Sequence, residues 1–234
     1  MYKKAIEFER KLSCLPVSHF WIANLSLLPR SPSEWDDTSV DLVFVLDSSS
    51  GITEPNFNVM KNFMKDFLSN ANIDGGNVRV GVISYSTKDN LQFYLNEHQD
   101  KRALFRAIDR MPYRPGRINM ADAFKTMRNR MYTTANGDRP RAPNVAVVVA
   151  GGVSNVNSRR TIPEAEQARA DGIHMYAIGV GMPDTTELKG VVSKPVDQHL
   201  FTTPDFSNLR NVGPKIVSSL RSSTCINVEP LLRI

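Results

Sequence analysis

Continuous apolar runs, rather than alternating ones, mark the strongest strand candidates in this chain. Residues 41–47 (DLVFVLD) and 145–150 (VAVVVA) each contain at least five apolar residues in a row. Such runs are typical of strands that are buried on both faces of a parallel sheet. The next candidate is VRVGVISY (78–85), whose β-branched composition supports a strand. The further predicted strands are residues 91–95, 173–180 and 200–202.

Between these strands, apolar residues recur at helical spacing. Pro55 stands near the start of one such segment, in which Met60, Phe63, Met64 and Phe67 fall on one helical face. The tetrapeptide TIPE at 161–164 resembles a capping box, which predicts a helix that begins there and ends at Gly172. The same spacing predicts helices at residues 101–111, 120–131 and 209–220, and a short helix is expected at 185–189.

Strands and helices alternate along the chain, and this order predicts the fold class. Buried strands that alternate with helices form an α/β fold, here a three-layer, doubly wound and mostly parallel sheet with helices on both sides. Ligands of such sheets bind outside the carboxyl ends of the strands. Functional side chains are therefore expected just after Leu46, Ala150 and Val180.

The overall composition of the chain is that of an ordinary globular protein. Its 234 residues are 41% hydrophobic and 23% charged, which excludes disorder or coiled coil as the main state. An apolar run of 18 residues is absent from the sequence, so no membrane span is expected. The net charge of +5 is too small to indicate a nucleic-acid partner.

The positive charge is concentrated in one segment. Residues 101–141 contain eleven Lys and Arg residues against three Asp residues, so the rest of the chain is slightly acidic. Solvated helix faces explain most single arginines of this kind. Arg114 and Arg117, however, belong to a loop rather than to a helix, and they are candidates for a binding role.

The sequence offers no recognisable catalytic motif. Phosphate loops (GxxxxGK[ST]), dinucleotide fingerprints (GxGxxG) and nucleophile elbows (GxSxG) do not occur in it. His174 falls within a predicted strand, where a packed histidine is the simpler interpretation. The chain is therefore predicted not to be an enzyme.

Cys14 and Cys225 stand near the two ends of the chain. Two cysteines are too few for a structural zinc site, which needs four ligands. They fit either a disulfide formed in an oxidising compartment or two free thiols. Residues 1–38 show no pattern of a secretory signal peptide, and their fold is not predicted.

Five runs in the same order resemble the von Willebrand factor A domain, most closely the extracellular matrix type found in matrilins and collagen VI. The resemblance assigns residues 39–225 to this domain, between tails 1–38 and 226–234. It implies a doubly wound sheet with one antiparallel edge strand. The runs are DLVFVLDSSSGI (41–52), VRVGVISYS (78–86), ANGDRPRAPNVAVVVAGG (135–152), ADGIHMYAIGVG (170–181) and the segment that ends near 225.

The family's metal-ion-dependent adhesion site (MIDAS) follows the pattern D-x-S-x-S, then a threonine and a later aspartate. Asp47 and Ser49 match the first two ligands. The other three positions fall on Gly51, Ile118 and Gly151, which have no side-chain oxygen. Because Mg²⁺ requires a near-octahedral set of oxygens, we expect Asp47 and Ser49 to be a non-functional remnant without a cofactor. They are expected to bind free backbone N–H groups instead.

The loops around this remnant are the expected ligand-binding face. Arg114 and Arg117 border the position of the metal, so an anionic partner such as a sulfated glycosaminoglycan or an acidic protein patch is expected to fit there. The residues of the predicted face are Ser48, Ser50, Arg114, Arg117 and Asn119.

The resemblance implies a non-enzymatic adhesion module of a secreted extracellular matrix protein, with partners such as collagens. It also makes Cys14 and Cys225 a candidate terminal disulfide. The alternative is an intracellular scaffold domain of a multiprotein complex, which the lack of a visible signal peptide favours.

Overall fold

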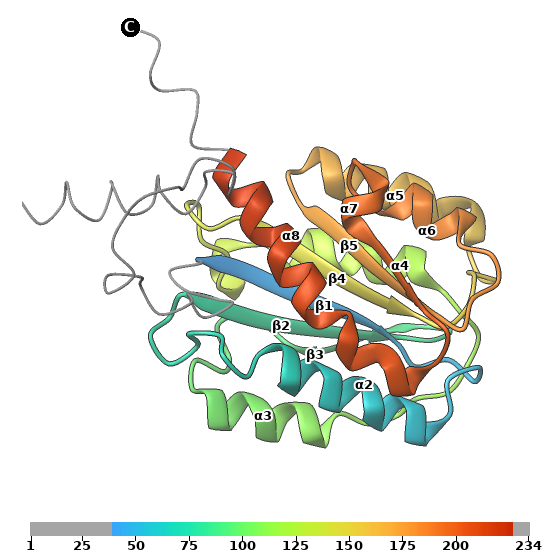
Figure 1. The fold of residues 1–234 in the computed structure, drawn as a ribbon, viewed down its shortest axis with the longest axis horizontal. Helices are drawn as coiled ribbons and strands as arrows, with labels where there is room; N and C mark the ends of the chain where they lie inside the picture. The colour runs from blue at the N-terminus through green and yellow to red at the C-terminus, as the bar shows by residue number, and fades with distance from the viewer. Residues whose placement is uncertain (1–38, 227–234) are drawn as a thin grey trace, which may run out of the picture.

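A six-stranded sheet forms the middle layer of the molecule (Figure 1). The computed structural model describes residues 39–226. The strands are β1 (Val40–Asp47), β2 (Val78–Tyr85), β3 (Asp89–Phe93), β4 (Asn144–Ala150), β5 (His174–Val180) and β6 (Leu200–Thr203), and they lie in the order β3-β2-β1-β4-β5-β6. β3 pairs antiparallel with β2 at one edge, and every other pair of neighbours is parallel. The predicted doubly wound sheet with one antiparallel edge strand is confirmed.

The apolar runs form the two central strands of the sheet, which are covered by helices on both faces. Every residue of β1 is buried, and so is β4 from Val145 onward. Side chains alternate between the two faces of β1: Leu42 and Phe44 enter one core, whereas Val43 and Val45 enter the other. The sheet therefore separates two apolar cores, and the three-layer architecture is confirmed.

Helices cover both faces of the sheet, as Figure 1 shows. One core receives apolar residues from α2 (Glu54–Phe67), α3 (Lys101–Arg110) and α8 (Gly213–Ile226). The opposite core receives them from α4 (Met120–Thr126), the π-helix Met127–Met131, α5 (Ser158–Ala170) and α6 (Thr186–Val191). The connections contain α7 (Val196–His199) and two 3₁₀ segments, Thr134–Asn136 and Phe206–Asn211. None of the described helices is long and apolar enough to cross a membrane.

The predicted start of α5 is wrong by one turn. The helix begins at Ser158, and Thr161, the expected capping residue, is fully buried inside it. Asn157 precedes the helix in the left-handed conformation, with φ 52°, which asparagine tolerates better than most residues. Its side-chain amide donates to Asp122 on α4, at 3.3 Å. A tertiary contact therefore accompanies the first turn of α5. The local sequence pattern does not reveal this contact.

Smaller boundary predictions also differ from the structure. β3 covers residues 89–93 rather than 91–95, with an irregular register opposite Val82 and Ile83. α6 continues through Gly190 to Val191, although this glycine was expected to follow the helix. The predicted stripe of Met120, Phe124, Met127 and Met131 is buried, but its last turn is a π-helix.

A buried ion pair fixes the amino-terminal end of β1. Asp41 is 0% exposed, and its carboxylate accepts hydrogen bonds from the backbone N–H of Arg139, at 2.7 Å, and from the Arg139 Nε, at 2.8 Å. The same guanidinium donates to the carbonyls of Val40, Gly76 and Asn77. Burial raises the pKa of Asp41, and the contact with Arg139 offsets part of that rise. Arg139 thus has a structural partner in the buried carboxylate of Asp41, although 22% of its side chain is exposed.

Replacing Arg139 with methionine is predicted to lower the free energy of unfolding by about 3–5 kcal/mol at pH 7, because it leaves a buried carboxylate without its counter-charge. The variant raises the pKa of Asp41 further, so the carboxyl is neutral at low pH and the loss shrinks as the pH falls toward 4. Urea denaturation at both pH values measures the two losses. An equal loss of unfolding free energy at pH 7 and at pH 4 would contradict the role of the charge.

Candidate functional site

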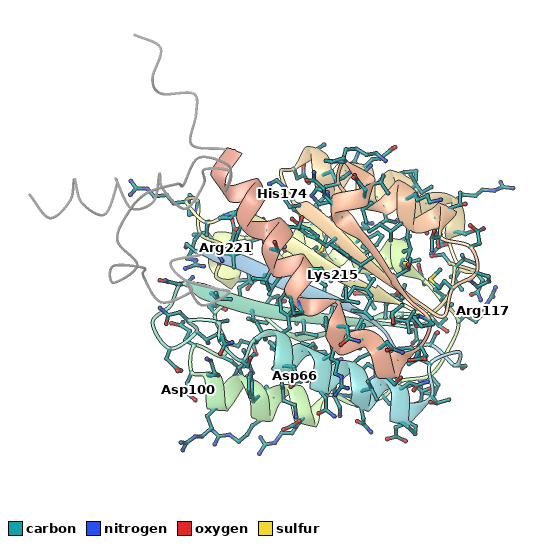
Figure 2. All side chains as sticks on the ribbon, viewed as in Figure 1. Asp66, Asp100, Arg117, His174, Lys215 and Arg221 are labelled. Atoms are coloured by element: carbon teal, nitrogen blue, oxygen red, sulfur yellow. The ribbon has the colours of Figure 1, made fainter. Side chains whose placement is uncertain are left out.

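Three loops meet at the carboxyl edge of the sheet, which Arg117 marks in Figure 2. They follow β1 (residues 48–52), α3 (residues 111–119) and β4 (residues 151–156). The N–H of Ser50 donates to the carbonyl of Gly116 at 2.8 Å, and the N–H of Asn155 donates to the carbonyl of Ile118 at 3.0 Å. These bonds join the three loops into one surface.

Asp47, the last residue of β1, lies beneath this surface and is 0% exposed. One carboxylate oxygen accepts the N–H of Ser49 at 2.8 Å, and the other accepts the N–H of Gly151 at 3.2 Å. Burial raises the pKa of Asp47, and the nearby polar groups of Ser49 and the N–H of Gly151 act against that rise. The expected structural role of this carboxylate is therefore visible, since it bridges the loops that follow β1 and β4.

Two buried hydroxyl groups near this carboxylate have no hydrogen-bond partner among the described residues. They belong to Ser49, which is 1% exposed, and to Tyr85, the residue opposite Asp47 in the register of β1 and β2. The prediction that the Ser49 side chain binds a free backbone N–H group is therefore wrong, and only Asp47 does so. Burial raises the pKa of Tyr85 well above its usual value, and the negative charge of Asp47 adds to this effect. The interior of the site is thus polar on the β2 side.

Apolar side chains occupy the opposite side. A Cβ atom added to Gly151 would overlap with Cδ1 of Ile52, which is buried. A Cβ atom added to Gly152 would come within 2.8 Å of Cδ1 of Ile118. Two isoleucines therefore line the space beside residues 151 and 152. The resemblance expects an aspartate in place of Gly151 and a threonine in place of Ile118.

The residues of this site do not fit a divalent cation. Asp47 supplies one carboxylate whose two oxygens already accept N–H groups, and Ser49 supplies one hydroxyl. Gly51, Ile118 and Gly151 supply no side-chain oxygen, whereas Mg²⁺ requires a near-octahedral oxygen set. Within residues 39–226, no group of three or more His, Cys, Asp or Glu side chains could hold a metal.

Two residues of the predicted binding face point into the protein. Ser48 is buried, and its hydroxyl donates to the carbonyls of Tyr85 and Arg114, at 3.0 and 3.2 Å. Asn119 is 1% exposed and caps α4: its carbonyl oxygen accepts the N–H of Asp122, and its amide donates to Thr87 and Asp122. Both side chains hold the loops in place. They are not available to a partner in this conformation.

The other three residues of the predicted face are exposed. Ser50 and Arg114 have free side chains within the described part of the chain, and one nitrogen of Arg117 donates to the carbonyl of Asn155 at 2.7 Å. Binding of a partner by these residues stays a prediction. The predicted disulfide is not described, since Cys14 lies outside residues 39–226 and the side chain of Cys225 is not described either.

Sequence reasoning missed one residue of this surface. Val153, two residues after Gly151, is 46% exposed and is the large hydrophobic side chain that stands out to solvent in the described structure. A single exposed apolar side chain is ordinary on a protein surface, so its exposure alone does not mark an interface. No signal in the local sequence could have identified it. A hollow of about 370 Å³ lies farther along the same edge, lined by Gly181, Met182, Pro183, Thr202, Thr203 and Pro204.

Comparisons with known proteins agree on one family. The model of the von Willebrand factor type A domain matches residues 41–215. Matrilin-2 of Mus musculus is 34% identical over 182 residues, which cover 76% of this chain and 18% of that protein. Matrilin-1 of Gallus gallus is 29% identical over 82% of this chain and 38% of its own length. The collagen alpha-1(XII) chain of Notophthalmus viridescens is 30% identical over 86% of this chain and 22% of its own length. The chain thus spans well under half of the relatives that it matches.

A solved structure has the same fold. Proximal thread matrix protein 1 from the mussel byssus is 26% identical, with a TM-score of 0.73, over 80% of this chain and 49% of that chain. Another structure of that protein has a zinc-occupied MIDAS motif.

Replacing Gly151 with aspartate, measured in EDTA, is predicted to lower the free energy of unfolding by about 1–3 kcal/mol. The new Cβ displaces Ile52, and a second carboxylate enters beside buried Asp47. Gly51→Ser is the matched control, because a Cβ at this exposed position meets only Ser49 Oγ at 3.8 Å; its expected effect is within about 0.5 kcal/mol. Urea denaturation of both variants is the measurement. A Gly151→Asp protein as stable as the control would argue against the packing described here.

Proposed function

The chain belongs to the von Willebrand factor type A domain family, and from this premise we propose that it is a non-enzymatic adhesion module of an extracellular matrix protein that binds its partner without a divalent cation. Matrilins and collagens among its relatives support the extracellular and secreted setting. The partner is a matrix protein such as a collagen.

The donor set around Asp47 is the observation that carries this proposal. A cation bound here would have to compete with two backbone N–H groups for the single carboxylate, and three ligand positions have no side-chain oxygen. Mg²⁺ loses its water ligands reluctantly, so a site with so few oxygens binds it poorly.

Arginines supply the positive charge in place of a cation. In the family, the metal accepts an acidic group of the partner as a ligand. Here Arg114 and Arg117 are exposed on the loop beside the site, and a guanidinium can bind a carboxylate through two parallel hydrogen bonds. Val153 adds an apolar contact on the same surface. We therefore assign the recognition of an acidic patch on a matrix protein to Arg114, Arg117, Val153 and Ser50.

Binding to immobilised collagen is predicted to be the same in Mg²⁺ and in EDTA, as measured by surface plasmon resonance. Replacing both Arg114 and Arg117 with alanine is expected to weaken it by about tenfold or more, because charge-assisted hydrogen bonds are lost. Arg159→Ala, at an exposed position on α5, is the control and should bind normally. Loss of binding in EDTA, or equal binding by all variants, would refute the proposed mode.

Restoring the ligands is predicted to create metal dependence. The triple variant Gly51→Ser, Ile118→Thr and Gly151→Asp has the family's complete ligand set, so Mg²⁺ should stabilise it by about 2.7 kcal/mol at a hundredfold excess over its Kd. The unchanged chain should show no shift in its melting temperature under the same conditions. A shift in the unchanged chain would overturn metal independence.

A further inference from the structure

The outward face of α3 carries a row of exposed arginines. Arg102, Arg106 and Arg110 are separated by four residues each, while Leu104 and Ile108 of the same helix are buried in the core. At 1.5 Å per residue, this α3 arginine row extends about 12 Å along the helix axis. Figure 1 shows α3 at the lower border of the molecule, and Asp100 marks its beginning in Figure 2.

The row works against the stability of its own helix. Like charges four residues apart on a helix repel each other, and the row contains two such pairs. The first turn holds Lys101 and Arg102 and no acid, although the amino end of a helix favours negative charge. An acid in place of Arg102 in the first turn would stabilise the helix and remove one repulsive pair, whereas Arg110 in the last turn suits the helix dipole. The arrangement therefore points to an anionic ligand outside the chain.

The acids around α3 are already engaged by other groups. Asp109 forms an ion pair with Lys65 at 2.6 Å. Asp100 accepts the N–H of Ala103, and Asp74 accepts the N–H of Lys101. Within residues 39–226, the three arginines of the row have no ion pair or side-chain hydrogen bond of their own. Their donors are thus available to an external partner.

We propose that the α3 arginine row is a binding site for a sulfated glycosaminoglycan, separate from the protein-binding loops at the carboxyl edge. The proposal rests on the extracellular setting proposed above, because such chains occur in the matrix. Guanidinium groups bind tetrahedral oxyanions through paired hydrogen bonds, and regular spacing on a straight helix suits a linear chain with repeated charges.

A sulfated polysaccharide fits this face better than an acidic protein does. Stable protein interfaces need buried apolar or aromatic anchors at their centre. The exposed positions 102, 106, 109 and 110 of α3 carry only charged side chains, whereas exposed Val153 lies at the carboxyl edge of the sheet. Electrostatic recognition of a polyanion requires no such anchor.

Heparin binding by the complete 234-residue chain tests the assignment. Surface plasmon resonance at several NaCl concentrations compares the unchanged chain with the variant Arg102→Gln, Arg106→Gln, Arg110→Gln. This variant is expected to bind about tenfold or more weakly near 0.15 M salt, and its log Kd should depend less steeply on log[NaCl], by about two to three units of slope. The corresponding Arg→Lys variant keeps the charge but loses the planar fork, so it should bind with intermediate affinity.

A charge-matched control separates the row from net charge. Arg159→Gln, Lys189→Gln, Lys215→Gln removes three exposed positive charges elsewhere, and it should change the Kd by no more than about twofold. Equal weakening of both triple variants would overturn the proposal. Failure of the unchanged chain to bind heparin, or binding of poly-glutamate with equal affinity, would also overturn it.

The same variants keep this result distinct from the proposed protein contact. The α3 variant should melt no lower than the unchanged chain, since like-charge repulsion is removed, and it should bind collagen normally. If the unchanged chain binds heparin but not collagen, the result counts against the proposed protein partner alone. The reverse result would count against the α3 site alone.

Discussion

A buried carboxylate without a counter-ion organises the functional edge of this molecule. Asp47 ends the central strand β1, is 0% exposed, and has two backbone N–H groups as its hydrogen-bond donors. Because a buried carboxylate is costly unless it is hydrogen-bonded, the loops that provide Ser49 and Gly151 must close over it. Ile52 and Ile118 then fill the space beside Gly151 and Gly152. The positions of these loops set the shape of the surface.

In the function that we propose, surface arginines take the place of a metal in recognition. The eleven basic residues between 101 and 141 have several different environments, which a net charge conceals. Arg139 stabilises buried Asp41, and Arg128 of the π-helix Met127–Met131 pairs with Glu164 of α5. Arg114 and Arg117 border the site at the carboxyl edge, whereas the α3 arginine row faces solvent on another side. The positive charge of this segment therefore serves several separate purposes.

Most of the fold could be predicted from the sequence, because burial on both faces leaves a plain apolar signature in β1 and β4. The amide-to-carboxylate contact of Asn157 with Asp122 at the start of α5 could not, since it joins two helices that are distant in sequence. The sequence shows which metal-ligand positions have no side-chain oxygen, but it does not show how the site is packed. Nothing in the local sequence indicates that Ile52 fills the space beside Gly151, that Asn119 is a buried cap, or that Val153 is exposed.

Anomalous diffraction from crystals of this chain soaked in MnCl₂ is the most direct test of a carboxyl edge that works without a metal. The structure predicts no anomalous peak near Asp47, with Ile52 still packed beside Gly151 and both carboxylate oxygens still accepting backbone N–H groups. A peak within about 2.0–2.3 Å of Asp47 and Ser49 oxygens, with Ile52 displaced, would contradict it.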